Sequence, residues 1–180
     1  MSHIVLRLAI VLALVAACPA CAEGKVEGET WRAPRGEFEV LMPAGWKKAD
    51  LPAATVWFVN EKSAAEKRSE FITVNAIKLV TKKTLDEVVA SSKDGFAKLL
   101  PDVKYLEDGP TTLAGIPAHR ITCAGKTAAG KQVQITEVIA HAAKTRYAVK
   151  FTTSPDRYEA LKPTIAAVLA SFKPGPEESK

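Results

Sequence analysis

The sequence is poor in the residues that build metal centres and nucleophilic active sites. It holds three histidines and three cysteines among 180 residues. Outside the expected leader the histidines are His119 and His141, which lack the close His, Cys and carboxylate spacing of zinc sites. Beyond the leader the chain also lacks the patterns CxxC, HExxH, GxSxG and GxGxxG. We therefore expect no metal and no cofactor.

A phosphate-binding loop is excluded as well. The stretch "CAGKT" (123–127) ends like a P-loop, but Arg120 stands where that motif needs its first glycine. The segment also falls in a predicted hairpin, whereas a P-loop precedes a helix.

Long apolar runs are absent except at the N-terminus. "LAIVLALVAA" (8–17) follows Arg7 and is too short to span a bilayer as a stable helix. A positive charge followed by a short apolar run is typical of an export signal, which we place at residues 1–22.

Two cleavage sites compete at the end of this leader. "VAAC" (15–18) fits a lipobox, after which the Cys18 thiol is acylated and anchors the chain to a membrane. "ACA" (20–22) fits the A-x-A rule, and cleavage there releases a soluble chain that begins at Glu23. We favour the lipobox because the apolar run continues up to it, although Pro19 counts against it. The protein is expected to be exported, as a membrane-anchored lipoprotein or as a periplasmic or secreted protein.

The few cysteines exclude a disulfide-stabilised domain, and the small net charge argues against a nucleic-acid-binding protein. Cleavage after Ala22 leaves Cys123 alone, whereas acylation of Cys18 keeps Cys21 as a possible partner of Cys123, and neither case is a disulfide framework. Removing the leader takes Arg7 from the 25 basic residues and leaves 24 against 20 acidic ones, a net charge of +4. That mild excess favours contact with acidic surfaces such as phospholipid headgroups over a role with nucleic acid.

The remaining length predicts one folded domain at residues 36–173. It has the apolar content of a globular chain, with no repeat and no low-complexity tract. The polar segment 23–35 is predicted to be a flexible tether, and 174–180 a disordered tail. We expect a monomer.

Hydrophobic periodicity predicts an α+β domain. Alternation of β-branched and aromatic residues predicts strands at 36–43, 55–61, 71–80, 103–115, 116–125, 131–142 and 145–154. The strand at 103–115 is expected to break at Gly109-Pro110. Strands in succession, interrupted by a helix and followed by another, indicate an antiparallel sheet of about six to seven strands.

Two helices are predicted by their spacing and their caps. Thr84 and Glu87 form a capping box at the start of a helix over 84–100. A second helix begins after Ser154, and Pro163 is expected to kink or restart it. One sheet face is predicted to pack under a helix; its members are Ile121, Val133, Ile135, Ile139, Tyr147, Val149 and Phe151.

Four short motifs resemble those of the PsbP-like superfamily, whose fold is shared with the Mog family of Ran-binding proteins. "FEVLMPAGW" (38–46) looks like the family's opening strand, proline and Gly-Trp turn, and "LAGIPAHRI" (113–121) is similar to its G-x-x-A hairpin strand. "RYAVKFTT" (146–153) resembles its last strand and "IAAVLASF" (165–172) its closing helix. The resemblance implies an α/β/α sandwich and membership of the bacterial exported branch of unknown function.

The resemblance also implies a mode of action. The family's characterised members bind proteins, so the chain is expected to be a non-catalytic module that binds a protein partner or an envelope component. The specific partners of plant PsbP and of the Mog family are not carried over, because nothing here matches the segment with which plant PsbP engages the photosystem and Ran belongs to the nucleus.

One cluster of residues allows an enzymatic alternative. Pairing Ile121 with Ile135 sets the register of two predicted strands. The same register brings His119 opposite Glu137, on the face that carries Cys123. These three side chains would be the nucleophile, base and orienter of a small hydrolase or redox enzyme. We favour a structural pair of His119 and Glu137 beside an inert thiol, because the stripe between them is apolar.

The opposite face is predicted to carry polar residues. The expected registers align Arg120, Thr136 and Lys150 across three strands, either as an anion-binding strip or as an ordinary solvated face. Arg120 and Lys150 are therefore the candidate binding residues.

Overall fold

The structure is a computed structural model that describes residues 26–50, 55–66, 70–81, 83–142 and 144–176. Antiparallel strands form most of it. A seven-stranded sheet has the order β3-β4-β5-β9-β8-β7-β6. Its strands are β3 (Trp46–Ala49), β4 (Val56–Asn60), β5 (Phe71–Lys78), β9 (Thr145–Thr153), β8 (Gln132–Ala142), β7 (Ile116–Lys126) and β6 (Lys104–Leu113). A three-stranded sheet consists of β1 (Gly28–Arg32), β2 (Phe38–Pro43) and β10 (Lys173–Pro174). The predicted α+β class and antiparallel sheet are confirmed.

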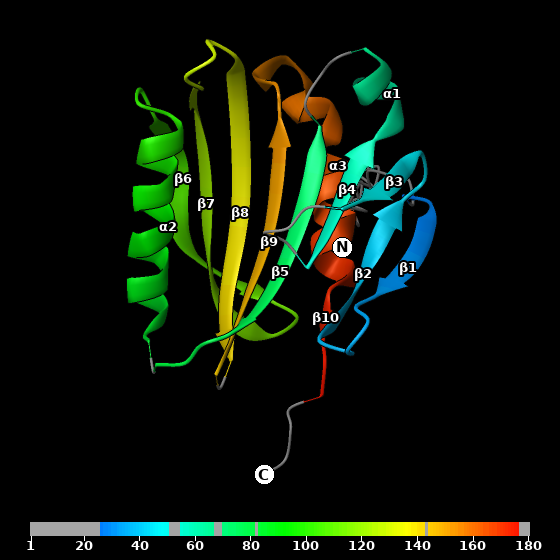
Figure 1. Ribbon diagram of the computed structural model, residues 1–180, viewed down its shortest axis with the longest axis vertical. Helices are drawn as coiled ribbons and strands as arrows, with labels where there is room; N and C mark the ends of the chain where they lie inside the picture. The colour runs from blue at the N-terminus through cyan, green and yellow to red at the C-terminus, as the bar shows by residue number, and fades with distance from the viewer. Residues whose placement is uncertain (1–25, 51–54, 67–69, 82, 143, 177–180) are drawn as a thin grey trace, which may run out of the picture.

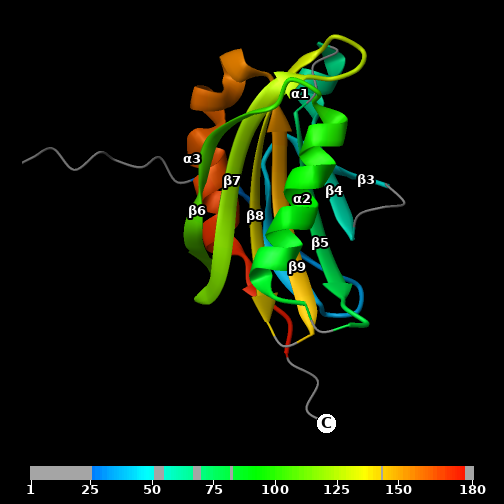
Figure 2. The ribbon, with the colours of Figure 1, turned by 90° about the vertical axis from the view of Figure 1, so that its left-hand side faces the viewer.

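Two long helices cover opposite faces of the seven-stranded sheet (Figure 1). α2 (Leu85–Leu99) packs against β7 and β8, whereas α3 (Pro155–Ser171) packs against β8, β9 and β2. Figure 2 shows the sheet between these two helices. The short α1 (Glu61–Ala65) follows β4. Among the described residues no helix is both long enough and apolar enough to cross a membrane.

The capping box predicted for α2 is confirmed. The Thr84 backbone N–H donates to Glu87 Oε2 at 2.7 Å, and the Glu87 N–H donates to Thr84 Oγ1 at 3.2 Å. Val88 and Phe96 are buried on the side of α2 that faces the sheet. Leu99, the last residue of the helix, is 49% exposed, whereas Leu100, which follows it, is fully buried.

α3 begins at the predicted cap and runs through its proline. Ser154 is the N-cap with Pro155 in the first turn, although the Ser154 side chain makes no capping hydrogen bond. The helix does not restart at Pro163: one helix extends from Pro155 to Ser171 with Pro163 inside it, and the predicted alternative of a kink there stays a prediction. Pro163 has no N–H to donate to the carbonyl four residues earlier.

The predicted break in β6 is also wrong. The strand continues through Gly109 and Pro110, which lie opposite Arg120 and His119 of β7. β6 is the edge of the sheet, where a residue without an N–H is tolerated. The irregularity lies instead at Leu106, between the paired residues on either side of it.

Apolar residues fill both faces of the sheet and form two cores. The core under α2 contains Val88, Val89, Phe96, Leu100, Ile121, Cys123, Val133, Ile135 and Ile139. The core under α3 includes Phe58, Ile72, Val138, Tyr147, Val149, Phe151, Ile165 and Val168. The sequence prediction placed members of both cores on one face. The paired residues Val138 and Val149 show that Tyr147, Val149 and Phe151 belong to the face under α3.

Two segments predicted to be unstructured are partly folded. Within the predicted tether, β1 pairs with β2, and the Trp31 ring lies 5.6 Å from Phe38 and 6.0 Å from Phe58. At the other end, β10 pairs with β2 and the Gly175 N–H donates to the Glu37 carbonyl at 2.8 Å. The domain therefore extends beyond 36–173. The leader, both cleavage sites, Cys18 and Cys21 lie outside the described residues.

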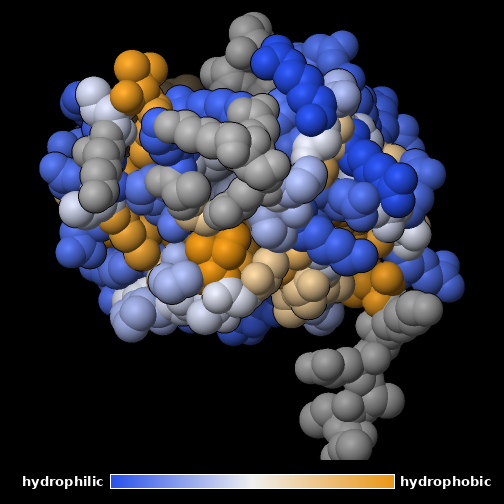
Figure 3. Space-filling view, turned by 90° about the horizontal axis from the view of Figure 1, so that it is seen from below, coloured by the Kyte–Doolittle hydropathy of each residue, from blue (hydrophilic) through white to orange (hydrophobic). Residues whose placement is uncertain are grey.

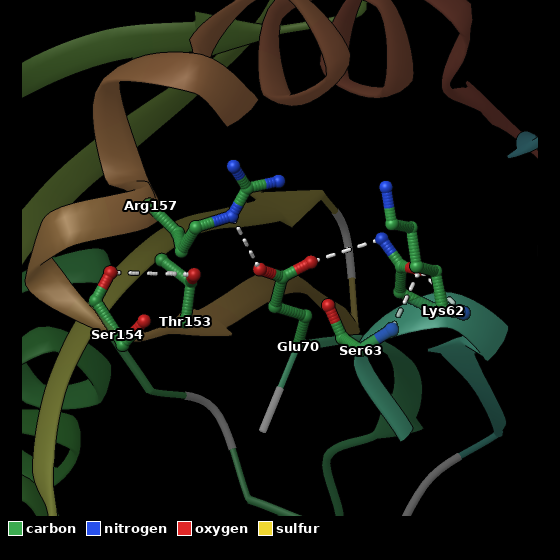
Figure 4. A network of polar contacts seen from close by, with 7 residues as sticks. Lys62, Ser63, Glu70, Thr153, Ser154 and Arg157 are labelled. Carbon is green, nitrogen blue, oxygen red and sulfur yellow. Dashed lines mark hydrogen bonds and ion pairs between the residues drawn. The ribbon is translucent and has the colours of Figure 1, made fainter. Parts of the chain in front are cut away.

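A buried ion pair joins the residue before β5 to α3, close to the start of α1 (Figure 4). The Glu70 carboxylate is fully buried and lies 3.2 Å from Arg157 Nε of α3. Asn60 Nδ2 donates to the same carboxylate at 2.9 Å. Asn60 Oδ1 in turn accepts the N–H groups of Lys62 and Ser63, so that Asn60 also caps α1.

Candidate functional site

Cys123 is buried in the core under α2. Its side chain is 0% exposed, and its neighbours across the strands are Tyr105 and Ile135. Burial, with a smaller contribution from the Glu137 carboxylate, raises the pKa of the thiol to about 11. A nucleophilic cysteine needs the opposite environment, exposed and electropositive, so this thiol is a packing residue. It is free of any disulfide.

The predicted pairing of His119 with Glu137 is wrong. His119 lies opposite Ile139, and Glu137 opposite Ile121, two residues along from the expected register. A shift by two keeps both side chains on the face of Cys123 but exchanges their partners. Glu137 accepts a short hydrogen bond from Ser92 of α2 instead. The nucleophile, base and orienter of the enzymatic alternative are therefore not assembled.

His119 belongs to a polar cluster that fastens α2 to the edge strand β6. His119 Nε2 lies 2.7 Å from Asp108 Oδ1, and Lys93 of α2 donates to the other oxygen of Asp108. The Tyr105 hydroxyl donates to the Lys93 carbonyl at 3.2 Å, and Lys93 Nζ lies 5.6 Å from the centre of the Tyr105 ring. Each of these bonds joins α2 or β7 to β6, so the cluster has a structural role.

Replacing Asp108 by Asn is expected to give a pH-dependent loss of stability. The hydrogen bonds from Lys93 and then from His119 hold the pKa of Asp108 below its ordinary value of about 3.9. The folded chain thus binds fewer protons at this site, so its stabilisation is complete above about pH 4 and disappears as the pH falls through the folded-state pKa. Urea unfolding at several pH values should show a difference between the two chains at pH 7 that vanishes in acid. An equal difference at both ends of the range would contradict this role.

The Cys123 thiol is expected to resist modification until the chain unfolds. With Cys18→Ser and Cys21→Ser in place, a thiol reagent near neutral pH should label nothing in the folded protein and one site in denaturant. The reason is the combination of burial and raised pKa given above. Rapid labelling of the folded chain would restore the enzymatic alternative.

The predicted anion strip does not form, because Arg120 and Lys150 lie on opposite faces. Arg120 is opposite Val138 on the α3 side, and its Nε lies 3.2 Å from a Glu107 carboxylate oxygen. Lys150 is opposite Glu137 on the α2 side. The expected register of β8 with β9 was off by one residue, which exchanges the two faces of a strand.

Lys150 instead belongs to a part of the α2-side face that α2 leaves uncovered. We call this surface the open face and define it by Trp57 of β4, Phe71 and Thr73 of β5, and Lys150 of β9. Trp57, Thr73 and Lys150 are in register across the three strands. Figure 1 shows α2 over the other end of the sheet, and none of the described helices crosses the front of β5 and β9. The sequence missed it because apolar alternation does not tell which strands a helix covers.

The open face combines an aromatic pair with a cation. The Trp57 and Phe71 rings meet edge to face with centroids 5.4 Å apart, and both side chains are half-buried. Lys150, also half-buried, forms no ion pair with any described residue. Aromatic residues are enriched in protein interfaces, and a cation beside them can steer an acidic partner.

Unsatisfied polar atoms are concentrated on the same side of the sheet. Four buried side-chain atoms of the described residues lack a hydrogen bond, and three of them are Trp57 Nε1, Thr73 Oγ1 and Arg146 Nε. Thr73 is 6% exposed, and Arg146 lies farther along this face, opposite Ile77. An unpartnered buried polar group costs about 1–3 kcal/mol, so this surface is less well satisfied than the rest of the sheet.

The described part of the chain offers two hollows and no cluster of metal-ligating side chains. No group of His, Cys, Asp and Glu there is placed to hold a metal ion. A cavity lined by Trp46, Phe151 and Leu161 among others has a volume of about 10 Å³, room for roughly one water. A hollow of about 280 Å³ beside Met42 and Trp46 lies away from the open face.

Solved structures share this fold. Cyanobacterial PsbP from Synechocystis is 15% identical to the chain, with a TM-score of 0.60 over 89% of this chain and 98% of that one. LpqN, involved in cell envelope biogenesis of Mycobacterium tuberculosis, is 14% identical, with a TM-score of 0.62 over 86% and 94%. A structure of the protein Mog1 is 14% identical, with a TM-score of 0.59 over 83% and 96%.

These likenesses confirm the PsbP-like fold that the motifs predicted. At such identities they show the fold alone. No family model matches the chain, and no curated protein matches it.

Proposed function

We propose that this chain, which has the fold of cyanobacterial PsbP, is an exported, non-catalytic module that binds a protein partner through its open face. The observation that carries the proposal is the open face itself, where Trp57, Phe71 and Lys150, which forms no ion pair with a described residue, lie together on a half-covered sheet. A helix covers the equivalent surface over β7 and β8. A bound partner would cover the open face in the same way.

A non-catalytic role is supported by the state of the reactive residues. The Cys123 thiol is buried with a raised pKa, and His119 and Glu137 are each held by another side chain. Catalysis needs such groups to converge on an accessible point.

The chemistry of the open face indicates what the partner presents. Two aromatic edges favour an apolar contact, and Lys150, with Arg146 four residues farther along the same strand, favours carboxylates. Arg146 Nε and Trp57 Nε1 are donors without acceptors, which carbonyl or carboxylate oxygens of a partner can satisfy after small side-chain rotations. We therefore expect a protein surface with an apolar centre and acidic residues at its edge.

Export and anchoring belong to the same proposal. The leader at 1–22 supports export, the lipobox supports an acyl anchor at Cys18, and the envelope role of LpqN agrees with both. Intact mass of the chain isolated from its own envelope tests the anchor. A mature chain that begins at Cys18 with added acyl mass supports it, and an unmodified chain that begins at Glu23 refutes it.

Trp57→Ala is expected to abolish most partner binding. Truncation of a central interface tryptophan costs about 2 kcal/mol or more, roughly a thirtyfold loss of affinity. Lys150→Gln should give a smaller loss that disappears at high salt. Affinity is measured with the crosslinked and identified partner, on variants whose melting temperatures have been checked.

Lys162→Gln is the matched control. It removes the same charge from α3, on the opposite side of the sheet, where Lys162 pairs with Glu159 at 2.8 Å. Equal losses for Lys150→Gln and Lys162→Gln, or unchanged binding by folded Trp57→Ala, would show that the open face is not the interface.

A further inference from the structure

The loop between β5 and α2 holds a valine out into solvent at one end of the molecule. Val80 is 103% exposed and Ile77 is 42% exposed. The loop is fixed on both sides of Val80. Before it, Leu79 packs on the core under α2, and its N–H donates to the Lys144 carbonyl in the β8–β9 turn at 2.7 Å. After it, the Thr84 capping box begins α2.

Cations surround these apolar side chains. Lys83 lies in the same loop, Lys144 in the adjoining turn, and Arg146 opposite Ile77. None of the three forms an ion pair with a described residue. The nearby acids are Asp86 and Glu87 in the first turn of α2, and the Glu87 carboxylate is engaged in the capping box. We call Ile77, Val80, Lys83 and Lys144 the basic tip.

We infer that the basic tip docks onto an anionic phospholipid surface. Seen from this end, the molecule presents apolar side chains that protrude among hydrophilic ones (Figure 3). A protruding apolar residue with lysines in its own loop and in the adjoining turn suits a bilayer interface, where the valine enters the headgroup boundary and the ammonium groups meet phosphates. A protein interface of ordinary size needs a broader apolar centre than two side chains. The inference is independent of the partner proposed for the open face.

The other exposed large apolar side chains lie elsewhere. Leu99, Tyr105 and Leu106 belong to the end of α2 and the start of β6. α2 runs from the basic tip to that end, so the two groups lie at opposite ends of the helix (Figure 1). The chain therefore supplies an internal control for non-specific adsorption.

An environment-sensitive fluorophore at position 80 tests the inference. The full chain is exported with Cys18→Ser and Cys21→Ser, so that no acyl chain is attached, and with Val80→Cys for labelling, since Cys123 is buried. Vesicles of phosphatidylcholine with about one third phosphatidylglycerol should shift the emission to the blue, and pure phosphatidylcholine should not. Salt should reverse the shift.

Two comparisons make the result decisive. Lys83→Gln with Lys144→Gln should weaken vesicle binding by about thirtyfold, whereas Lys98→Gln with Lys104→Gln, at the other end of α2, should leave it unchanged. A label introduced by Leu106→Cys should show no shift. The inference fails if position 80 shows no shift on anionic vesicles, if neutral vesicles or position 106 respond equally, or if the label responds to a protein and not to lipid.

Discussion

Arg157→Ala is expected to lower the free energy of unfolding by about 3 kcal/mol. The substitution leaves the fully buried Glu70 carboxylate with the Asn60 amide as its side-chain partner and no opposite charge, and an uncompensated buried charge costs about 3–5 kcal/mol. The lower end of that range applies because Arg157 is 39% exposed and water can approach the gap. Urea unfolding of the two chains measures the difference.

A second substitution distinguishes the cost of the unpaired Glu70 charge from the cost of lost packing. Glu70→Gln in the Arg157→Ala background removes the stranded charge and should recover part of the stability. Arg32→Ala is the surface control, because its ion pair with Glu39 involves an arginine that is 76% exposed and is worth no more than about 1 kcal/mol. A loss no larger for Arg157→Ala than for Arg32→Ala would show that the buried pair does not hold α3 to the segment before β5.

Phe151→Ala is expected to cost about 3–5 kcal/mol, a large share of the stability of one domain. Phe151 is 5% exposed in the core under α3 and lies opposite Ile72 and Thr136 of the neighbouring strands. Truncation leaves a cavity that the rigid sheet cannot close. Thermal and urea unfolding should both show the loss.

Leu106→Ala is the control for this second substitution. Leu106 is 55% exposed at the irregularity of the edge strand, so its truncation should change stability by less than about 0.5 kcal/mol. An unchanged melting temperature for Phe151→Ala would show that the Phe151 side of β9 does not pack in the core under α3.

The elements could be predicted because their signals are local. Thr84 and Glu87 mark the start of α2, Ser154 and Pro155 that of α3, and alternating side chains mark the long strands. The short elements β1, β3, α1 and β10 carry too few residues for a period, and Trp31 in β1 is held by distant aromatic rings. Their formation depends on tertiary packing.

The register could not be predicted because the sheet is apolar on both faces. In such a sheet a shift of one residue still leaves apolar side chains on both faces, so the sequence pattern does not select one register. The predicted pairing of β8 with β9 is therefore one residue away from the observed one. The pairing of β7 with β8 was placed two residues away. Those shifts created the expected pair of His119 with Glu137 and the expected strip of Arg120 with Lys150, and neither exists in the structure.

The open face lay beyond sequence reasoning for a further reason. Trp57 and Phe71 look like ordinary strand residues, and they are only half-buried because α2 covers the other end of the sheet. No periodicity in the strand sequences encodes the position of α2.

Photocrosslinking from position 150 in the native envelope tests the proposed partner-binding role most directly. A benzophenone amino acid there should give one discrete protein adduct, and the adduct should disappear when Trp57→Ala is added to the folded chain. The same amino acid at position 159, on α3 and on the other side of the sheet, should give no such adduct. The proposal is contradicted if position 159 yields the same adduct, or if position 150 yields none in a folded, envelope-located chain.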